Sequence, residues 1–452
     1  MSERKARREI DKAIRHLLDY TGPNDEWASR LDTLMDQFLA PVAEALELHL
    51  DEVSDYFLDG PFGHMVFGFL FEEYATVQWD QDTESLIDAY LKQRGWREGP
   101  AGRRYLQALG ASALQLWEIT AVKPGAYVAL RAYGTSGLSM RVKEVAASDH
   151  LHQWDGLVAR VLATGSGYTF SGAMLPFRPE VARRVHAVLE ALPDNARQML
   201  QDLVDRGELD TLPADMATFG DDMAADELPQ IAFRLWAVDT YVTDNRSPPE
   251  LRNMDDEPIE PTQLRFLLRA PSAQVAEALN ASAVLQQEPA AERWNWFPKP
   301  YADIALEERV SIQGHIALTE TALTLDTNSL ARAERGRHML STLLGDSVGT
   351  PLTVHQNLER MAEDAEPVSL TSDVPLEIQQ AVAAQLTTHY RQTLDEAIPM
   401  LNGKTPRECA ADPALRADVI GWLKSLENSG ERASQLSYDF GWMWNELHLQ
   451  RD

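Results

Sequence analysis

The sequence has a single cysteine, Cys409, and far fewer basic than acidic side chains. One cysteine excludes a disulfide framework and any zinc site built from several thiolates. The 70 acidic residues outnumber 41 basic ones and give the 452-residue chain a formal net charge of −29. This balance argues against direct binding of nucleic acid, whose phosphates require cations. The longest apolar run, around residues 65–71, is too short to cross a bilayer, so we expect no membrane span.

The compact motifs of common enzyme classes are also missing. The chain contains no Gly-x-x-x-x-Gly-Lys-Ser/Thr loop, no Gly-x-Gly-x-x-Gly turn, no His-Glu-x-x-His helix and no Gly-x-Ser-x-Gly elbow. Its charged first ten residues lead into no apolar secretory segment. We therefore expect a cytoplasmic protein of bacterial type without a cofactor, and these absences favour protein–protein contacts over catalysis.

The acidic excess is confined to two stretches. Residues 16–91 hold 17 acids and one base (net −16), and residues 187–260 hold 18 acids and 5 bases (net −13). Because −16 and −13 sum to −29, the rest of the chain is balanced. The stretches are interpreted either as solvated faces or as a surface that imitates a polyanion and binds a basic partner.

Hydrophobic spacing predicts an α+β, multidomain chain. Residues 1–112 are expected to form an acidic helical region. Residues 113–178 change to short alternating runs separated by glycine and proline turns, which predicts a small five-stranded β-barrel-like module. The prediction for the remainder is a helix with acidic linkers over 179–261, an α+β domain over 262–365 and a helical interaction module over 373–452.

Within residues 179–261 the pattern makes three finer predictions. The first helix is expected to stop near Pro193. Residues 207–228 are acidic and poor in large apolar side chains, which predicts a linker or long loop. The apolar run over 231–242 predicts a strand.

Two groups of residues suggest binding chemistry. His150 and His152 would share one face of a strand and, with Asp155, would offer metal ligands; the alternative is a polar strand end leading into a buried Trp154. Trp294 and Trp296 would likewise share a face and form a ligand or peptide platform, or else fill a core.

The clearest local signal is a capping box from Thr405 to Glu408, with Pro406 at the first helical position. Cys409 follows at the start of this helix, where the helix dipole would favour a thiolate. Cysteine is nevertheless among the most buried residue types, and we expect Cys409 to be buried rather than nucleophilic.

The segment 394–408, Leu-Asp-Glu-Ala-Ile-Pro-Met-Leu-Asn-Gly-Lys-Thr-Pro-Arg-Glu, is similar to a pattern in uncharacterised bacterial proteins, some of which carry a SEC-C zinc-chelating motif. The motif itself is absent here. The segment also resembles the toxin-binding domain of Xre/MbcA/ParS antitoxins, in which a Pro-x-Leu-x-Gly-x-Thr/Ser-Pro turn opens a helix. This resemblance implies a protein-binding module whose contact residues are Leu401, Lys404 and Arg407, with Gly403, Thr405 and Pro406 shaping the turn.

Together these features predict a non-enzymatic cytoplasmic adaptor or antitoxin-like regulator that binds a protein partner. One alternative is an enzyme, either a hydrolase or metal-dependent, with a dispersed site near His150, His152 and Asp155. Another is an acidic nucleic-acid mimic that binds a basic partner through electrostatic attraction, which salt would weaken by screening.

Overall fold

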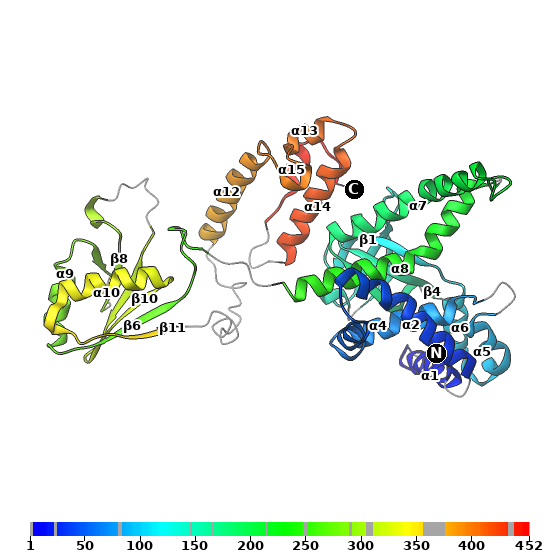
Figure 1. Ribbon diagram of the computed structural model, residues 1–452, viewed down its shortest axis with the longest axis horizontal. Helices are drawn as coiled ribbons and strands as arrows, with labels where there is room; N and C mark the ends of the chain where they lie inside the picture. The colour runs from blue at the N-terminus through cyan, green and yellow to red at the C-terminus, as the bar shows by residue number, and fades with distance from the viewer. Residues whose placement is uncertain are drawn as a thin grey trace. The chain divides into compact units, whose positions relative to one another are not determined.

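The computed structural model describes residues 3–21, 25–79, 84–144, 147–164, 167–213, 215–246, 252–288, 292–303, 311–355, 376–432 and 438–451. They belong to two compact units, one of Met1–Asn245 with Thr371–Asp452 and one of Arg246–Leu370 (Figure 1). Helices and strands occur in both units, so the predicted α+β, multidomain class is confirmed. The boundary predicted between 365 and 373 lies outside the described residues.

The first unit begins with a helical region, as predicted. Its core is aromatic: Phe38 packs edge-on against Phe69 and Phe233, with ring centroids 6.1 and 5.6 Å away. No helix among the described residues is both long and apolar enough to cross a membrane. The elements are α1 (Glu3–Thr21), α2 (Asp25–Leu46), α3 (Leu50–Ser54), the π-helical turn η1 (Asp55–Asp59), α4 (Gly63–Thr76), α5 (Leu86–Arg94), the 3₁₀ turn η2 (Gly95–Arg97) and α6 (Pro100–Gly110).

A closed five-stranded barrel follows, and this prediction is confirmed. The strand order around the barrel is β1-β2-β3-β5-β4, with the β3–β5 pair parallel and the others antiparallel. Gly125, with φ of +70°, makes the predicted turn between the first two strands. The elements are β1 (Leu114–Lys123), β2 (Tyr127–Ala132), β3 (Met140–Lys143), the 3₁₀ turn η3 (Ala147–Asp149), β4 (Gly156–Thr164) and β5 (Gly167–Phe177).

Two long helices after the barrel overturn three predictions. Helix α7 (Pro179–Asp205) continues through Pro193, and α8 (Met216–Asp244) occupies most of the predicted linker and all of the predicted strand. Ala232, Phe233, Trp236 and Ala237 are buried at helical spacing. Because α8 packs against both α2 and α7, apolar side chains also lie outside this stripe, and the sequence lacks the clear 3.6-residue apolar period of a surface helix.

The C-terminal residues of the first unit form the predicted helical module. Helix α13 starts with the capping box, since the hydroxyl of Thr405 accepts from the Glu408 amide at 3.1 Å and the Glu408 carboxylate accepts from the Thr405 amide at 2.9 Å. The elements are α12 (Leu376–Thr393), the 3₁₀ turn η6 (Pro399–Leu401), α13 (Pro406–Ala411), α14 (Arg416–Arg432) and α15 (Gly441–Glu446).

The second unit is a six-stranded antiparallel sheet of order β11-β6-β10-β9-β8-β7. Buried residues of α9 and α10 pack on one face, where they meet Leu264, Phe266 and Leu325. The elements are β6 (Thr262–Leu267), α9 (Ser272–Asn280), β7 (Leu285–Gln287), β8 (Arg293–Trp296), the 3₁₀ turn η4 (Tyr301–Asp303), β9 (Gly314–Leu318), β10 (Ala322–Thr327), α10 (Leu330–Leu344), the 3₁₀ turn η5 (Gly345–Ser347) and β11 (Leu352–His355).

Candidate functional site

Helix α14 binds the barrel through a buried carboxylate. Asp155, immediately before β4, has no exposed surface. It accepts hydrogen bonds from the His152 amide at 2.8 Å, the side-chain amide of Asn428 at 2.7 Å and the guanidinium of Arg432 at 2.6 Å. A buried carboxylate is tolerated when donors satisfy its oxygens, so Asp155 fixes the position of α14 on the barrel.

A second carboxylate of the barrel receives two cations. Glu118 of β1 is paired with Arg131 of β2, at 2.5 Å, and with Lys424 of α14. The ammonium of Lys424 also lies 4.5 Å from the centre of the Trp154 ring, within cation–π range. Lys424 therefore connects α14 with two elements of the barrel at once.

Trp154 is the third contact. Its backbone is left-handed, with φ of +72°, a conformation that costs free energy for a bulky residue and requires support from its surroundings. The Trp154 indole donates to Glu427 of α14 at 2.6 Å, and the Trp444 indole donates to the same carboxylate at 2.9 Å. The two indoles, one from each side of the contact, are thus held by a single buried acceptor. We call Glu118, Trp154 and Asp155, with Lys424, Glu427, Asn428 and Arg432, the barrel–α14 interface.

Of the three proposed metal ligands, only Asp155 takes part in this interface with its side chain. The carboxylate of Asp155 is engaged by its donors, and the nearest His152 ring nitrogen lies 3.8 Å from it. His150 is exposed and lines a separate hollow of about 150 Å³ together with Arg178, Asp239 and Arg432. In the described residues, no group of three or more His, Cys, Asp or Glu side chains is placed to hold a metal ion.

The two tryptophans of the suggested platform are buried in the second unit. Trp294 and Trp296 share the face of β8 that belongs to the core, together with Ile316 and Leu325. The Trp294 indole donates to Asn280 of α9 at 2.7 Å. This placement corresponds to the core-filling alternative.

The residues suggested by the antitoxin resemblance divide into three environments. Leu401 is buried in the module, Lys404 is exposed, and Arg407 is half-buried. Arg407 forms ion pairs with Asp395 at 2.9 Å and with Glu446 at 2.6 Å, which join the turn to α15. Cys409 is 1% exposed and burial raises the pKa of its thiol, opposite to the requirement for a nucleophile.

Sequence reasoning missed a buried carboxylate pair on α4. Glu73 is ion-paired with Arg160 of β4 at 2.6 Å, while Glu72 accepts from the Ala173 amide of β5 at 3.1 Å. Burial raises the pKa of Glu72 to about 7 and also raises the pKa of Glu73, which Arg160 opposes. Glu72 therefore exchanges a proton near neutral pH. The available signal was the position of both acids at the end of the longest apolar run.

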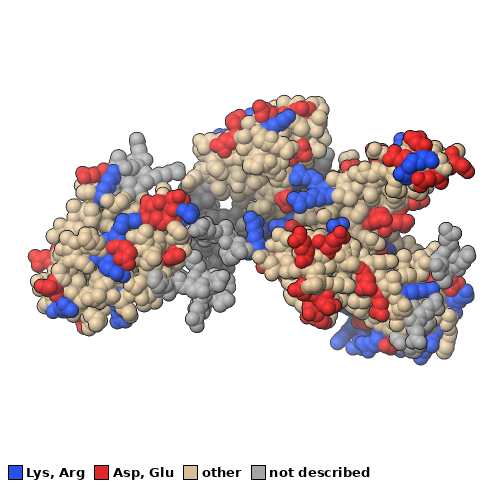
Figure 2. All heavy atoms as spheres, viewed as in Figure 1, with Lys and Arg blue, Asp and Glu red and all other residues tan. Residues whose placement is uncertain are grey.

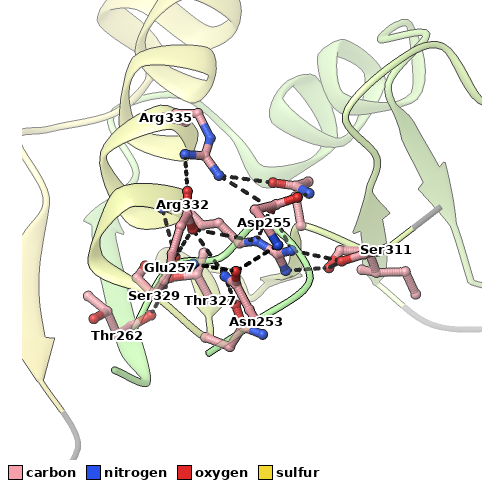
Figure 3. A network of polar contacts seen from close by, with 12 residues as sticks. Asn253, Asp255, Glu257, Thr262, Ser311, Thr327, Ser329, Arg332 and Arg335 are labelled. Carbon is pink, nitrogen blue, oxygen red and sulfur yellow. Dashed lines mark hydrogen bonds and ion pairs between the residues drawn. The ribbon is translucent and has the colours of Figure 1, made fainter. Parts of the chain in front are cut away.

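The second unit contains a polar network around Arg332 (Figure 3). This residue of α10 is 2% exposed, and its guanidinium donates to Asp255 at 2.7 and 2.9 Å, to Ser311 at 2.8 Å and to the Ile312 carbonyl at 3.0 Å. The guanidinium of Arg335, 2.6 Å away, holds the pKa of Glu257 down at about 2. The network fastens the segment around 253–257 to α10, which is a structural role.

The same network bears on the polyanion-mimic hypothesis. Asp255 and Glu257 belong to the acidic stretch 187–260, yet their charges are paired with Arg332 and Arg335. Asp239 of that stretch is paired with Arg178 at 2.8 Å. These carboxylates are engaged inside the protein, so the mimic hypothesis gains no support from them.

Comparisons with family models, with curated proteins and with solved structures gave no match. Functional inference therefore rests on the geometry of this chain.

Proposed function

We propose that the chain is a non-enzymatic adaptor that acts through protein–protein contacts, with its C-terminal module of residues 376–451 as the partner-binding part. The observation that carries this proposal is the seating of α14 on the barrel through Asp155. At this contact, the charged side chains of α14 form hydrogen bonds and ion pairs with complementary groups of the barrel. Polar contacts of this kind between parts of one chain use the same hydrogen bonds and ion pairs as interfaces between proteins.

The turn between η6 and α13 supplies the surface for the partner. Asn402 and Gly403 have φ values of +56° and +76°, and Ile398 is bridged to Lys404 across the turn. The capping box fixes the helix that follows. Lys404 is therefore an exposed cation on an ordered turn, which lowers the entropy lost on binding. In the antitoxin-like form of the proposal, the partner is an enzyme that this contact holds inactive. The proposal includes a cytoplasmic location, where a single reduced cysteine is expected.

The test is capture of a partner by the tagged full-length chain from cytosol of the source cell. We expect one protein at stoichiometric yield with the wild type and loss of that protein with Lys404→Glu. The matched control is Lys123→Glu, which reverses another exposed lysine in the same unit and should retain the partner. Recovery of no stoichiometric protein, or equal recovery by all three chains, would refute the adaptor proposal.

A further inference from the structure

A basic surface is present on this strongly acidic protein. The exposed cationic side chains come from α1 and from the segment formed by η2 and the flanking ends of α5 and α6, and we call them the basic patch: Arg4, Lys5, Arg7, Arg8, Lys12, Arg15, Lys92, Arg94, Arg97, Arg103 and Arg104. Residues 3–15 contain 6 bases and 3 acids and residues 92–104 contain 5 bases and 1 acid, so the net charge is 11 − 4 = +7. The whole chain carries −29.

Two of the acids in these segments are engaged internally. Glu9 accepts from the Ala101 amide at the start of α6 at 3.0 Å, and Glu98 accepts from Tyr90 and contacts His16 at 2.7 Å. Among the bases, Lys92 is paired with Glu84. The positive charge therefore faces solvent, while part of the negative charge faces the protein.

Helix α1 presents its charge as a straight stripe. Arg4, Arg8, Lys12 and Arg15 recur at intervals of four, four and three residues, which places them on one helix face over about 16 Å. The buried face of α1, with Ala13 and Leu17, lies opposite and packs on α6. At Gly102 a Cβ atom would lie 2.8 Å from the Cβ of Ala13, so this glycine permits the close approach of the two helices. The close packing of α1 on α6 therefore holds the basic stripe in a fixed position.

Trp96 indicates which polyanion the basic patch fits. Its side chain is 77% exposed and lies between Arg94 and Arg97 in sequence. Tryptophan favours the headgroup level of a bilayer, where its apolar ring and N–H group are both accommodated, and clustered Lys and Arg residues bind anionic lipid. We propose that the basic patch binds the surface of a membrane rich in anionic phospholipid, with Trp96 inserted among the headgroups.

The distribution of charge favours a membrane over nucleic acid. Figure 2 shows basic side chains along the lower edge of the α1-containing unit and acidic ones on the face above. A flat bilayer touches only that edge, and salt screens the carboxylates that lie more than a Debye length of about 8 Å away. A nucleic acid that wraps the patch would instead meet acidic side chains on the adjoining face (Figure 2). Repulsion of the acidic body by the membrane also selects a single orientation of the protein.

The test is co-sedimentation of the full-length chain with vesicles at physiological ionic strength. We expect binding to vesicles in which phosphatidylglycerol replaces part of the phosphatidylcholine, and none to phosphatidylcholine alone. Each neutralised residue should weaken binding about fivefold, so changing Arg4, Arg8, Lys12 and Arg15 to Gln together should weaken it about 600-fold. Trp96→Ala should weaken it several-fold.

The matched control changes Arg184, Arg197, Arg265 and Arg293 to Gln, because these four exposed arginines lie on α7, β6 and β8 and give the same loss of charge. We expect the control to bind like the wild type. If both quadruple variants lost vesicle binding equally, the loss would depend on net charge alone, and the proposal would be overturned. Binding of single-stranded or duplex DNA that the stripe substitutions abolish, without binding to anionic vesicles, would overturn it in favour of nucleic acid.

Discussion

The carboxylate of Asp155 and the side-chain amide of Asn428 are joined by a hydrogen bond of 2.7 Å across 273 residues of sequence. Asp155 belongs to the barrel and Asn428 to α14. The pair is buried, so each group depends on the other to replace the water lost on folding.

Substitution of Asp155 by Ala should release α14 from the barrel. The change removes one acceptor from each of Asn428 and Arg432. Because Arg432 is 38% exposed and its guanidinium can be hydrated, we expect a loss of about 1–3 kcal/mol. Hydrogen exchange of the α14 amides should rise in this variant. Asp149→Ala, which alters an exposed carboxylate of the same segment, should change stability by less than about 0.5 kcal/mol. Unchanged exchange in Asp155→Ala would show that α14 is held mainly by other contacts.

Glu72 should make the first unit less stable as pH rises from about 4.5 to about 7. The folded-state pKa is about 7 against 4.5 in the reference state, so in this window the folded chain holds a proton that the unfolded chain has lost. The groups facing Glu72 are Glu73, Arg160 and Tyr105. Folding then weakens by about 3 kcal/mol across the window.

Glu72→Gln removes that titration. At pH 8 the variant should unfold at higher urea concentration than the wild type, and at pH 4 the difference should disappear. The exposed Glu44→Gln change serves as the control and should follow the wild type at both pH values. A wild-type-like pH profile in Glu72→Gln would contradict the raised pKa.

Arg332 and Arg335 should differ sharply on truncation although both contact Asp255. Arg332→Ala leaves the Ile312 carbonyl and Asp255 without their buried donor, and should destabilise the second unit by about 3 kcal/mol or more. Arg335 is 47% exposed, and its truncation should cost less than about 1 kcal/mol. Hydrogen exchange of β6 and α10 reports both changes in the full chain. Equal effects of the two substitutions would contradict the role of burial in this network.

Cys409 should be inert in the folded protein. Its burial and raised thiol pKa both suppress the reactive thiolate. A thiol reagent such as dithionitrobenzoate should label the native chain slowly and label one thiol promptly in urea. Rapid labelling of the native protein would restore the nucleophile hypothesis.

The barrel was predictable from sequence because three of its four connections carry a glycine or proline signal, at 123–125, 134–137 and 165–167, and its strands are short apolar runs between them. The capping box at Thr405 was predictable for the same reason, since its hydrogen bonds join residues three positions apart. Local patterns determine such elements without reference to the rest of the chain.

Helix α8 was not predictable in this way. Its apolar run over 231–242 packs against helices far away in sequence, such as α2. Because these contacts bury several sides of the run, its sequence shows no clear period from which a helix could be predicted. The chain also continues as helix through Pro193, whose ring lies against Gly220 of α8: a Cβ at Gly220 would be 2.7 Å from that of Pro193. Packing between α7 and α8 thus overrides the usual helix-breaking effect of proline.

The barrel–α14 interface was missed for a related reason. The sequence predicted a metal site at His150, His152 and Asp155 because these residues lie close together in the chain. The side chains that bind Asp155 lie on α14, far away in sequence. Glu72 was equally hidden, because the sequence holds several adjacent acid pairs and only the fold distinguishes the buried one.

The interleaved order of the two units has a consequence for biosynthesis. Asp155 and Trp154 emerge from the ribosome long before the residues of α14, because the second unit is translated in between. At about 5–20 residues per second, the 273 residues between Asp155 and Asn428 take roughly 14–55 s to synthesise. During that interval the nascent barrel presents an uncovered carboxylate and an exposed indole. A chaperone that binds such a surface, or an early-arriving partner, would find it open only on chains still being made.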